Sequence, residues 1–310
     1  MADVIQSYID GSFKGWAEDI APEAFLMLKD SDTFKPFMLA APPGGSRRSR
    51  IVEAVRQVLN KDIKVRVQTI GECVSMMAVN ATEYMSCVDI AIRGDAEKYR
   101  RLFNPYCYGT GRILVGNGQL GNSDGSTGSW MAEAIAKYGV ICEDDPDVPA
   151  YSSSVAKQFG SSRQLVNKFV DLGKQHTVKS ATLCKTWDDA VTGLCNGYLL
   201  GVCSNRGFSM TPGSDGFHTP KGSWSHAMTV IHIDDEYKDP HCWILNSWDD
   251  VHGHLKDFTT GEDLPIGVLR VRKAVLQSML AQGDSYLYSL DFNGFPDQQA
   301  KIDKALFKMN

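Results

Sequence analysis

The two halves of the sequence carry different hydrophobic patterns, and this change constrains the fold more than any single residue does. Up to about residue 176, the strongest apolar patterns have helical spacing, at 51–60, 73–92 and 130–138. After that point short extended runs dominate, at 178–183, 198–203, 227–233, 243–246, 266–272 and 285–290. Helices followed by strands predict an α+β fold, with a helical first lobe and a strand-rich, barrel-like second lobe.

Two further segments flank these lobes. We expect an N-terminal extension over 1–60, the helical lobe over 61–176, the β-rich lobe over 177–290 and a C-terminal tail over 291–310. The tail has a helical pattern whose apolar side chains share one face: Ile302, Ala305, Leu306 and Met309. We therefore interpret both end segments as arms that dock on the body or on a partner.

Composition and the N-terminal sequence exclude several classes of protein. The 310 residues include 43% hydrophobic and 22% charged residues, which is typical of a globular protein, and the net charge of −5 argues against general nucleic-acid binding. The sequence has neither an apolar run of about 18 residues nor a basic start followed by an apolar stretch, so we expect no membrane span and no secretion signal. These observations predict a cytoplasmic protein.

Eight cysteines occur without any CxxC pair, which argues against zinc-ribbon and thioredoxin-like sites. Without an export signal, free thiols are the expected state. A basic triplet, Arg47, Arg48 and Arg50, follows a proline- and glycine-rich stretch. It is interpreted either as a solvated loop or as a contact for phosphate or an acidic partner.

One cysteine is placed for chemistry. Cys73 follows a glycine-glutamate pair and opens the longest helical pattern, and a thiol at a helix N-terminus beside a histidine has two influences that favour thiolate. Among seven histidines, His226 stands at the start of an apolar strand, where its side chain can reach a cleft between lobes. Asn246 ends the next strand, and its amide oxygen can fix the orientation of an imidazole ring.

These segments resemble the papain family of cysteine peptidases. The likeness covers about residues 65–290 in the family's order, and His226 follows Cys73 at close to the roughly 130–150 positions expected. The most specific motif is a strand that ends in Asn-Ser-Trp with a glycine a few residues on. The segments that carry the resemblance are Gly71–Ala78, Ser225–Val230, Trp243–Trp248 with Gly253, and more weakly 130–151 and 187–202.

The resemblance implies roles for particular residues. Cys73 would be the nucleophile, His226 the base and Asn246 the residue that orients it. Gln68 would form the oxyanion hole with the Cys73 backbone N–H, although it lies five positions before the cysteine and not the usual six. The resemblance also implies a set of substrate-binding residues: Gly125, Ser126, Gly128, Trp130, Ser225 and Trp248.

Four positions depart from the family pattern. Val74 and His252 stand where tryptophans are usual, and Ser225 replaces a common Asp or Asn. Glu72 directly precedes the nucleophile, and a neighbouring carboxylate is expected to raise the pKa of the thiol.

We therefore carry two functions forward. The first is a cysteine endopeptidase that acts on a peptide or protein substrate through an acyl-enzyme and needs neither cofactor nor metal. The second is a papain-fold structural subunit of a larger assembly such as a phage virion, because the chain looks similar to papain-like reading frames without secretion signals found in bacteriophages; this resemblance implies the virion as the alternative location. Transglutaminase-like chemistry uses the same residue types but is disfavoured by the Asn-Ser-Trp motif. A metal site is disfavoured because the histidines and aspartates at 232–254 lack HExxH or similar spacing.

Overall fold

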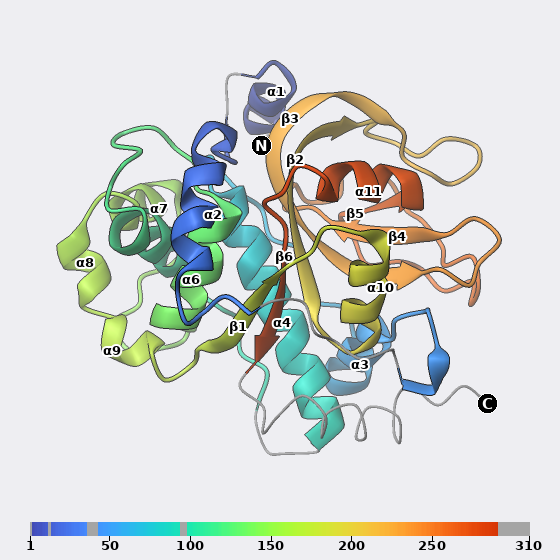
Figure 1. Ribbon diagram of the computed structural model, residues 1–310, viewed down its shortest axis with the longest axis horizontal. Helices are drawn as coiled ribbons and strands as arrows, with labels where there is room; N and C mark the ends of the chain where they lie inside the picture. Colours follow the sequence, from blue (N-terminus) through green and yellow to red (C-terminus); the bar gives the residue numbers. More distant parts are fainter. Residues whose placement is uncertain (1, 12–13, 36–42, 94–97, 291–310) are drawn as a thin grey trace.

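The computed structural model describes residues 2–11, 14–35, 43–93 and 98–290, and all that follows concerns these parts of the chain. The centre of the second half is one six-stranded antiparallel sheet in the order β1-β6-β2-β3-β4-β5, open at β1 and β5. Its strands are β1 (Val178–Leu183), β2 (Leu199–Phe208), β3 (Pro220–Asp234), β4 (His241–Leu245), β5 (Val268–Arg272) and β6 (Tyr286–Leu290). Helices α10 (Trp187–Cys195) and α11 (Lys273–Leu280) pack against this sheet (Figure 1).

The first half is helical, as the periodicity predicts. Its central element is α4 (Cys73–Arg93), which contacts β2, β3 and β6 on one side and other helices on the other. Such contact on all sides explains why apolar and small residues fill nearly every position of the helix. The remaining helices are α3 (Ile51–Leu59), α5 (Asn104–Gly109), η3 (Thr110–Val115), α6 (Gly128–Tyr138), α7 (Ser153–Phe159), α8 (Arg163–Asn167) and α9 (Val170–Gly173).

The α+β class, with helices before strands, is confirmed. Helices α3, α4, α6 and α10 lie where the patterns place them, and α10 begins with the predicted Thr186 cap, here part of a capping box with Asp189. The patterns missed α5 and α7–α9, because helices of four to seven residues show too few turns for a period to register. Strands β2 and β3 are longer than expected.

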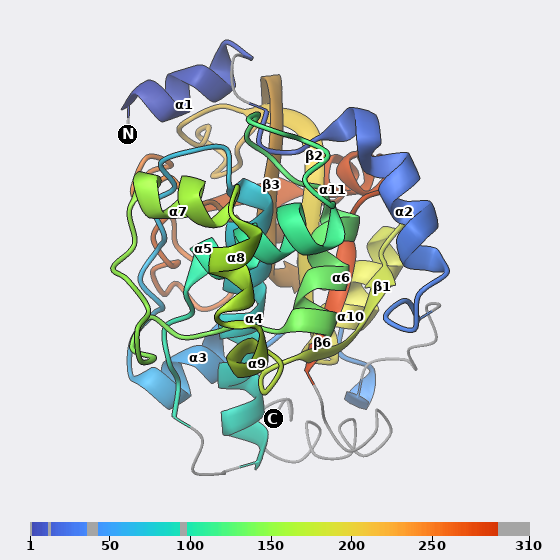
Figure 2. The ribbon, with the colours of Figure 1, turned by 90° about the vertical axis from the view of Figure 1, so that its left-hand side faces the viewer.

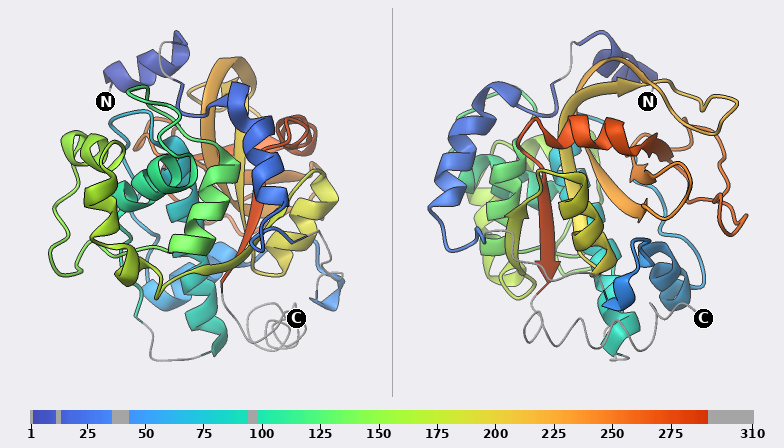
Figure 3. Two further views of the ribbon diagram at one scale, coloured as in Figure 1. Left: turned by 60° about the vertical axis from the view of Figure 1, so that its left-hand side comes forward. Right: turned by 45° about the vertical axis from the view of Figure 1, so that its right-hand side comes forward.

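The described part of the N-terminal extension docks on the body of the chain itself. Helix α1 (Ala2–Ile9) contacts β3 and lies across the top of the molecule in Figure 1. Helix α2 (Ala21–Lys29), which follows the 3-10 turn η1 (Glu18–Ile20), runs beside α6, and both views in Figure 3 show it on the outside of the helical half. Figure 2 shows α1 and α2 on different sides of the molecule, joined by the segment that crosses between the two halves.

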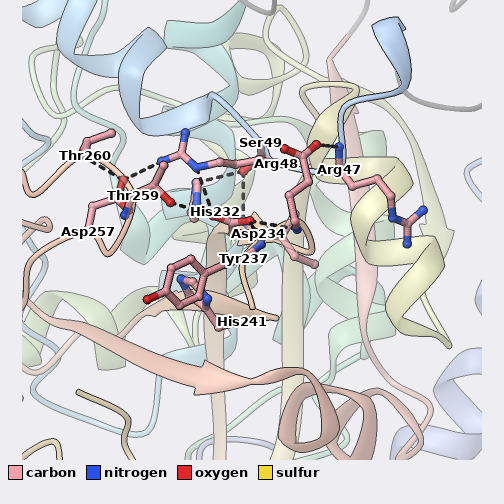
Figure 4. Close-up of polar contacts among 12 residues, drawn as sticks. Arg47, Arg48, Ser49, His232, Asp234, Tyr237, His241, Asp257, Thr259 and Thr260 are labelled. Atoms are coloured by element: carbon pink, nitrogen blue, oxygen red, sulfur yellow. Dashed lines mark hydrogen bonds and ion pairs between the residues drawn. The ribbon is translucent and has the colours of Figure 1, made fainter. Parts of the chain in front are cut away.

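The basic triplet finds its acidic partners within the chain. Arg48 is 5% exposed and reaches Asp234 at 3.2 Å and Asp257 at 2.5 Å, as Figure 4 shows. Arg47 pairs with Asp235 at 2.6 Å. Arg50 pairs with Glu53 at 3.3 Å. Arg47 and Arg48 therefore fasten the extension to the end of β3 and the loops beside it, whereas Arg50 pairs within the extension itself; the acidic partners of the triplet are residues of this chain.

The predicted C-terminal arm, 291–310, lies outside the described residues. Among the helices of the described parts, none has the length and apolar character to cross a membrane. All eight cysteines are free and buried, as expected for thiols outside a disulfide framework.

Candidate active site

Two predicted residues from distant parts of the sequence, His226 and Asn246, are hydrogen-bonded to each other, and a third, Cys73, reaches the same strand through the backbone of Ala227. Cys73 is the first residue of α4, His226 lies in β3, and Asn246 directly follows β4, which pairs with β3. All three are at most 1% exposed. The Cys73 sulfur contacts the backbone of Ala227, the neighbour of His226, so the strand register carries the histidine to the helix start.

The hydrogen bonds fix which nitrogen of His226 is basic. Its Nε2 lies 2.8 Å from Asn246 Oδ1, and that oxygen also accepts from the Ser247 backbone N–H at 2.7 Å. Because an amide oxygen only accepts, Nε2 carries the proton and Nδ1 holds the lone pair. Nδ1 has no hydrogen-bond partner within the described chain. The ring is thus oriented as a base whose lone pair is unused.

Asn246 is held in turn by a residue that sequence reasoning treated as a departure from the family and as a disfavoured metal ligand. His252 is fully buried, and its Nε2 accepts from Asn246 Nδ2 at 2.9 Å. The amide is therefore clamped between two imidazoles, with its oxygen turned toward His226. Trp248 stacks on the His226 ring with centroids 4.7 Å apart, which shields the bond from water.

Glu72 points away from the sulfur. Its carboxylate accepts from Asn104 Nδ2 at 2.6 Å and from the Tyr151 hydroxyl, and burial raises the pKa of Glu72 to about 7. The pKa of the Cys73 thiol is raised to about 12, and burial is the largest cause. The expected effect of the neighbouring carboxylate is therefore secondary to the removal of water from the site.

That water is displaced by the N-terminal extension. The Tyr8 hydroxyl is hydrogen-bonded to the Cys73 sulfur and accepts from Gln68 Nε2 at 3.0 Å. Its ring lies 4.7 Å from the His226 ring and 5.4 Å from that of Trp248. Tyr8 itself is 0% exposed. One phenol thus contacts the predicted nucleophile, base and oxyanion-hole residue together.

Residues 15–17 continue this cover along the cleft. The Gly15 and Trp16 amides both donate to Ser225 O at 3.0 Å. On the other wall, Ser126 N donates to Gly15 O at 3.0 Å and Ala17 N donates to Ser126 O at 2.8 Å, a parallel bridge. A Cβ on Gly15 would collide with Cys73 Sγ, so only glycine permits this approach. We name residues 8–17, as far as they are described, the covering segment.

A side chain anchors the covering segment as well. Trp16 is 1% exposed, and its indole N–H donates to Asp284 Oδ2 at 2.8 Å. Asp284 lies two positions before the start of β6 and is hydrogen-bonded to the start of α6. The segment is therefore tied to both halves of the chain by backbone and side-chain bonds.

Burial sets the charge state of the pair. It lowers the pKa of His226 to about 4, despite the bond to Asn246, while the pKa of Cys73 is raised to about 12. Both shifts disfavour the charged forms, since a covered site cannot hydrate them. In the covered state the thiol and the imidazole are therefore neutral near pH 7.

Comparison with known proteins gives a consistent result at the level of structure. No protein-family model and no curated protein sequence matches the chain. Solved structures do match, among them procathepsin L 3 of the Tenebrio molitor larval midgut, with 13% identity over 93% of this chain and 79% of that one, at a TM-score of 0.56. Xylellain, a cysteine protease from Xylella fastidiosa, matches with 15% identity over 82% of this chain and 88% of its own, at a TM-score of 0.52. The chain has the papain-like fold.

A proform also matches: that of Amb a 11, a cysteine protease of ragweed pollen, with 10% identity over 91% of this chain and 77% of that one, at a TM-score of 0.52. The coverage of 91–93% for the two pro-proteins extends the likeness beyond the two lobes into the N-terminal extension. The comparison supports the fold alone, because every identity is below one in six.

Of the residues that the resemblance implies for substrate binding, Gly125, Ser126, Ser225 and Trp248 lie against the covering segment. Ser126 and Ser225 form the backbone walls of the cleft, and Trp248 stacks on the base. Gly125, at φ +108°, is tight against the segment, because an added Cβ would lie 2.8 Å from Lys14 O. Gly128 N donates to Asp284 at 2.7 Å. Trp130 is elsewhere: it packs on Gly116 and, with residues of α2, lines a separate cavity of about 150 Å³.

The cleft remains open on the helical side of the segment. A cavity of about 550 Å³ lies there. It is bordered by Gly11, Lys14, Tyr108, Arg112, Gly121, Asn122, Ser123, Asp124, Lys157, Gly160 and Ser161. Arg112 forms part of its wall rather than a free charge, because it donates to the carbonyls of Gly121, Gly125 and Gly160.

The histidines considered as metal ligands do not gather. His232 stacks on Trp243 with centroids 3.8 Å apart, and His252 serves Asn246. Among the described residues, the group whose ligand atoms lie within 4.8 Å of one another is Cys142, Asp144 and Asp145. Both of its aspartates are paired with the same arginine, Arg100, at 2.7 and 2.6 Å, which balances one of their two negative charges.

Proposed function

We propose that this chain is a cysteine peptidase whose cleft is closed by its own covering segment in the state described here. The observation that carries the proposal is the His226–Asn246 bond of 2.8 Å, which leaves Nδ1 of the histidine as an unused base, one residue along the strand from the Ala227 backbone that contacts the Cys73 thiol. The proposal covers the roles of Cys73, His226, Asn246 and Gln68, and the class of substrate, a peptide or protein.

Chemistry would begin with transfer of the Cys73 proton to His226 Nδ1. The thiolate then attacks a peptide carbonyl carbon, and the C=O electron pair moves onto oxygen, where Gln68 Nε2 and the Cys73 backbone N–H stabilise the negative charge. Collapse of this intermediate breaks the C–N bond, and the leaving amine takes the proton from His226. A water molecule, deprotonated by His226, then hydrolyses the thioester and restores the thiol.

The covering segment opposes each of these requirements. The Tyr8 hydroxyl is hydrogen-bonded to both the Gln68 side-chain amide and the Cys73 sulfur, so neither group is available to a substrate. Gly15 occupies the space directly over the sulfur, where a carbonyl would have to lie. Burial keeps both reacting groups neutral. Displacement of the segment must therefore precede catalysis, and rehydration would then allow the helix N-terminus to favour the thiolate.

A second function rests on the same closure. A sulfur that is 0% exposed and covered by the chain's own residues also suits a body that no longer catalyses and serves as a subunit of an assembly such as a phage virion. The two proposals differ in one respect: only a peptidase gains turnover when the segment is loosened.

The experiment uses the full chain with Tyr8→Ala, which removes the side chain that covers the thiol. A fluorogenic peptide library is assayed with this variant alone and combined with Cys73→Ala, and Cys87→Ala is the matched control because it removes another buried thiol from α4. Turnover that is lost with Cys73→Ala and kept with Cys87→Ala supports the peptidase. If the variant exposes Cys73 to iodoacetamide yet cleaves no peptide, the peptidase proposal is wrong, and a size measurement then tests for assembly.

A further inference from the structure

The loop that leads into α4 carries the proposed oxyanion-hole residue, and its shape depends on one carbonyl, that of Ile70. Gln68 Nε2 donates to Ile70 O at 3.2 Å, and the Glu72 backbone N–H donates to the same oxygen at 2.8 Å. At the other end of the loop, Gln68 N donates to Ser247 O at 3.0 Å. The direction of the Gln68 side-chain amide is therefore set by the place of Ile70 O. We call residues 68–72 the oxyanion loop.

Two carboxylates hold the residues on either side of Ile70. The Gly71 backbone N–H donates to Asp124 Oδ2 at 3.1 Å, and the Thr69 backbone N–H is hydrogen-bonded to the carboxylate of Glu72. Gly71 is pressed against its partner, since an added Cβ would lie 2.7 Å from Asp124 Cβ. The Ile70 carbonyl thus lies between two fixed points, and one of them is the side chain that directly precedes the proposed nucleophile.

Glu72 is fixed in turn by side chains of the helical half. It is 0% exposed, its Oε2 accepts from Asn104 Nδ2 at 2.6 Å, and its Oε1 accepts from the Tyr151 hydroxyl. Because the Tyr151 proton is directed to the carboxylate, the Thr69 hydroxyl is the donor in its 3.0 Å contact with the Tyr151 oxygen. Thr69 is therefore tied to Glu72 twice, through its backbone and through Tyr151. Hydrogen bonds to a carboxylate are also stronger than those between neutral groups.

The oxyanion loop directs its amide at a space that the covering segment marks. The Tyr8 hydroxyl oxygen lies 3.0 Å from Gln68 Nε2 and is hydrogen-bonded to the Cys73 sulfur. An oxygen that develops charge during attack by this sulfur has to lie in the same space to meet the same donor. A shift of Ile70 O would turn Gln68 Nε2 away from it.

We propose that Glu72 is a positioning residue for the oxyanion hole: its carboxylate holds the oxyanion loop in the shape that directs Gln68 Nε2 at the space beside the Cys73 sulfur. This inference rests on the proposed peptidase function, because an oxyanion forms only when the thiolate attacks a carbonyl. Loss of the carboxylate loosens the loop but leaves the His226–Asn246 bond in place.

The test compares one reaction of Cys73 that uses the oxyanion hole with one that does not, in full-length chains that carry Tyr8→Ala. Iodoacetamide is attacked at a saturated carbon and loses iodide, so no oxyanion develops. A peptide aldehyde is attacked at its carbonyl carbon: the C–S bond forms, the C=O electron pair moves onto oxygen, and that oxygen takes the proton from His226. The resulting thiohemiacetal loses no group, and its affinity is measured by protection of Cys73 against iodoacetamide, without turnover.

Removal of the carboxylate should affect the two reactions differently. Glu72→Ala should weaken aldehyde binding roughly tenfold to a hundredfold, which is part of what one oxyanion-hole donor contributes, and should lower kcat by a similar factor with little change in KM. Labelling of Cys73 by iodoacetamide should stay within a few-fold of the parent chain. Glu72→Gln should restore most of the binding. Asn104 Oδ1 has no hydrogen-bond partner among the described residues, so it can accept from the introduced amide after Asn104 rotates.

Tyr151→Phe removes one of the two ties to Thr69 and should weaken aldehyde binding by a few-fold. The matched control is Tyr106→Phe, whose lost hydroxyl bond to Tyr138 O lies outside the cleft, and it should leave aldehyde binding unchanged. Slow labelling of the other seven buried cysteines checks the fold of every variant. Hydrogen exchange of the oxyanion loop, measured in chains that retain Tyr8, requires neither opening nor turnover and should be faster with Glu72→Ala than with Glu72→Gln.

Several outcomes overturn the inference. Equal aldehyde binding, or equal hydrogen exchange of the loop, with and without the carboxylate would show that Glu72 positions nothing. An equal loss of both reactions in the Glu72→Ala chain would show a general disruption at the start of α4. If Glu72→Gln is as weak as Glu72→Ala, the charge and not the set of ties is what matters.

The same measurements separate this inference from the proposed function. If aldehyde binding depends on Glu72 as expected while no peptide is cleaved, the positioning role stands and the peptidase proposal fails. If peptides are cleaved equally well with and without Glu72, the peptidase proposal stands and the positioning role fails. A chain that reacts with iodoacetamide but binds no aldehyde lacks a working oxyanion hole, and both proposals are then wrong.

Discussion

Replacement of Tyr8 tests whether the covering segment controls access to Cys73. The phenol is 0% exposed, and its ring packs on two residues of the body: His226 at 4.7 Å and Trp248 at 5.4 Å between centroids. Its hydroxyl joins Gln68 to Cys73. These interactions are all lost when the segment leaves, so a substitution here weakens the covered state and not the lobes.

The size of the effect follows from this burial. Truncation of a buried aromatic residue to alanine costs about 3–5 kcal/mol. If most of that free energy is lost from the covered state, Tyr8→Ala raises the open population roughly a hundredfold to a few thousandfold. Tyr8→Phe keeps the ring contacts and loses only the hydroxyl bonds, about 1 kcal/mol, so the open population should rise roughly fivefold.

The assay is the rate of iodoacetamide labelling at Cys73 under native conditions, read against the other seven cysteines, which are also buried. When closure is fast relative to labelling, this rate reports the open population. Tyr106→Phe is the matched control, since its hydroxyl donates to Tyr138 O at 2.8 Å, outside the cleft. Equal labelling of Cys73 in the wild type and the Tyr8→Ala chain would refute the claim that the segment protects the thiol.

Three other predictions concern pH, the clamp on Asn246 and the docking of the extension. The pKa of Cys73 is raised to about 12 only while the thiol is covered, so the covered state loses stability as pH rises above the pKa of the uncovered thiol. The rate at which iodoacetamide labels Cys73 should therefore keep rising about tenfold per pH unit past pH 9, where the labelling rate of an exposed thiol would level off. In an opened chain, His252→Phe should lower kcat about tenfold because Asn246 loses its acceptor, and His252→Gln should restore part of it. Arg48→Met leaves the buried carboxylates of Asp234 and Asp257 without their cation, and it should reduce the free energy of unfolding, measured by urea titration, by about 3–5 kcal/mol. The labelling rate of Cys73 should not increase in this variant.

Much of the fold could be predicted because its signals are local. The start of α4 at Cys73, the capped start of α10 and the strand that ends just before Asn246 each depend on a few neighbouring residues. The order of those signals along the chain then indicated the arrangement of the two halves. The geometry between His226 and Asn246 follows from the pairing of β3 with β4, which a short connection between two strands makes the expected one.

The covering segment could not be predicted in this way. Its bonds join residues far apart in the sequence, such as Tyr8 to Gln68 and Trp16 to Asp284. The residues next to Tyr8 and Trp16 in the sequence do not indicate where these two side chains will be buried. The role of His252 was missed for a related reason. A histidine in place of the usual tryptophan suggests only the loss of a packing contact, and its hydrogen bond to Asn246 becomes evident only in the structure.

Because the site is covered, the same residues can be unreactive in this state and still be arranged for the proposed catalysis. A buried neutral thiol is a poor nucleophile and resists oxidation, since both reactions proceed through the thiolate. The features that would activate Cys73, the helix start and the His226 lone pair, are already in place and are offset by the loss of water. No rearrangement of the lobes is then needed for activation: removal of Tyr8 and Gly15 from the sulfur would restore hydration, and with it the charged pair that the helix dipole favours. On this reasoning, the affinity of the covering segment for the cleft determines how reactive Cys73 is. Substitutions in the segment, and not in the lobes, are therefore expected to change the reactivity of Cys73 most.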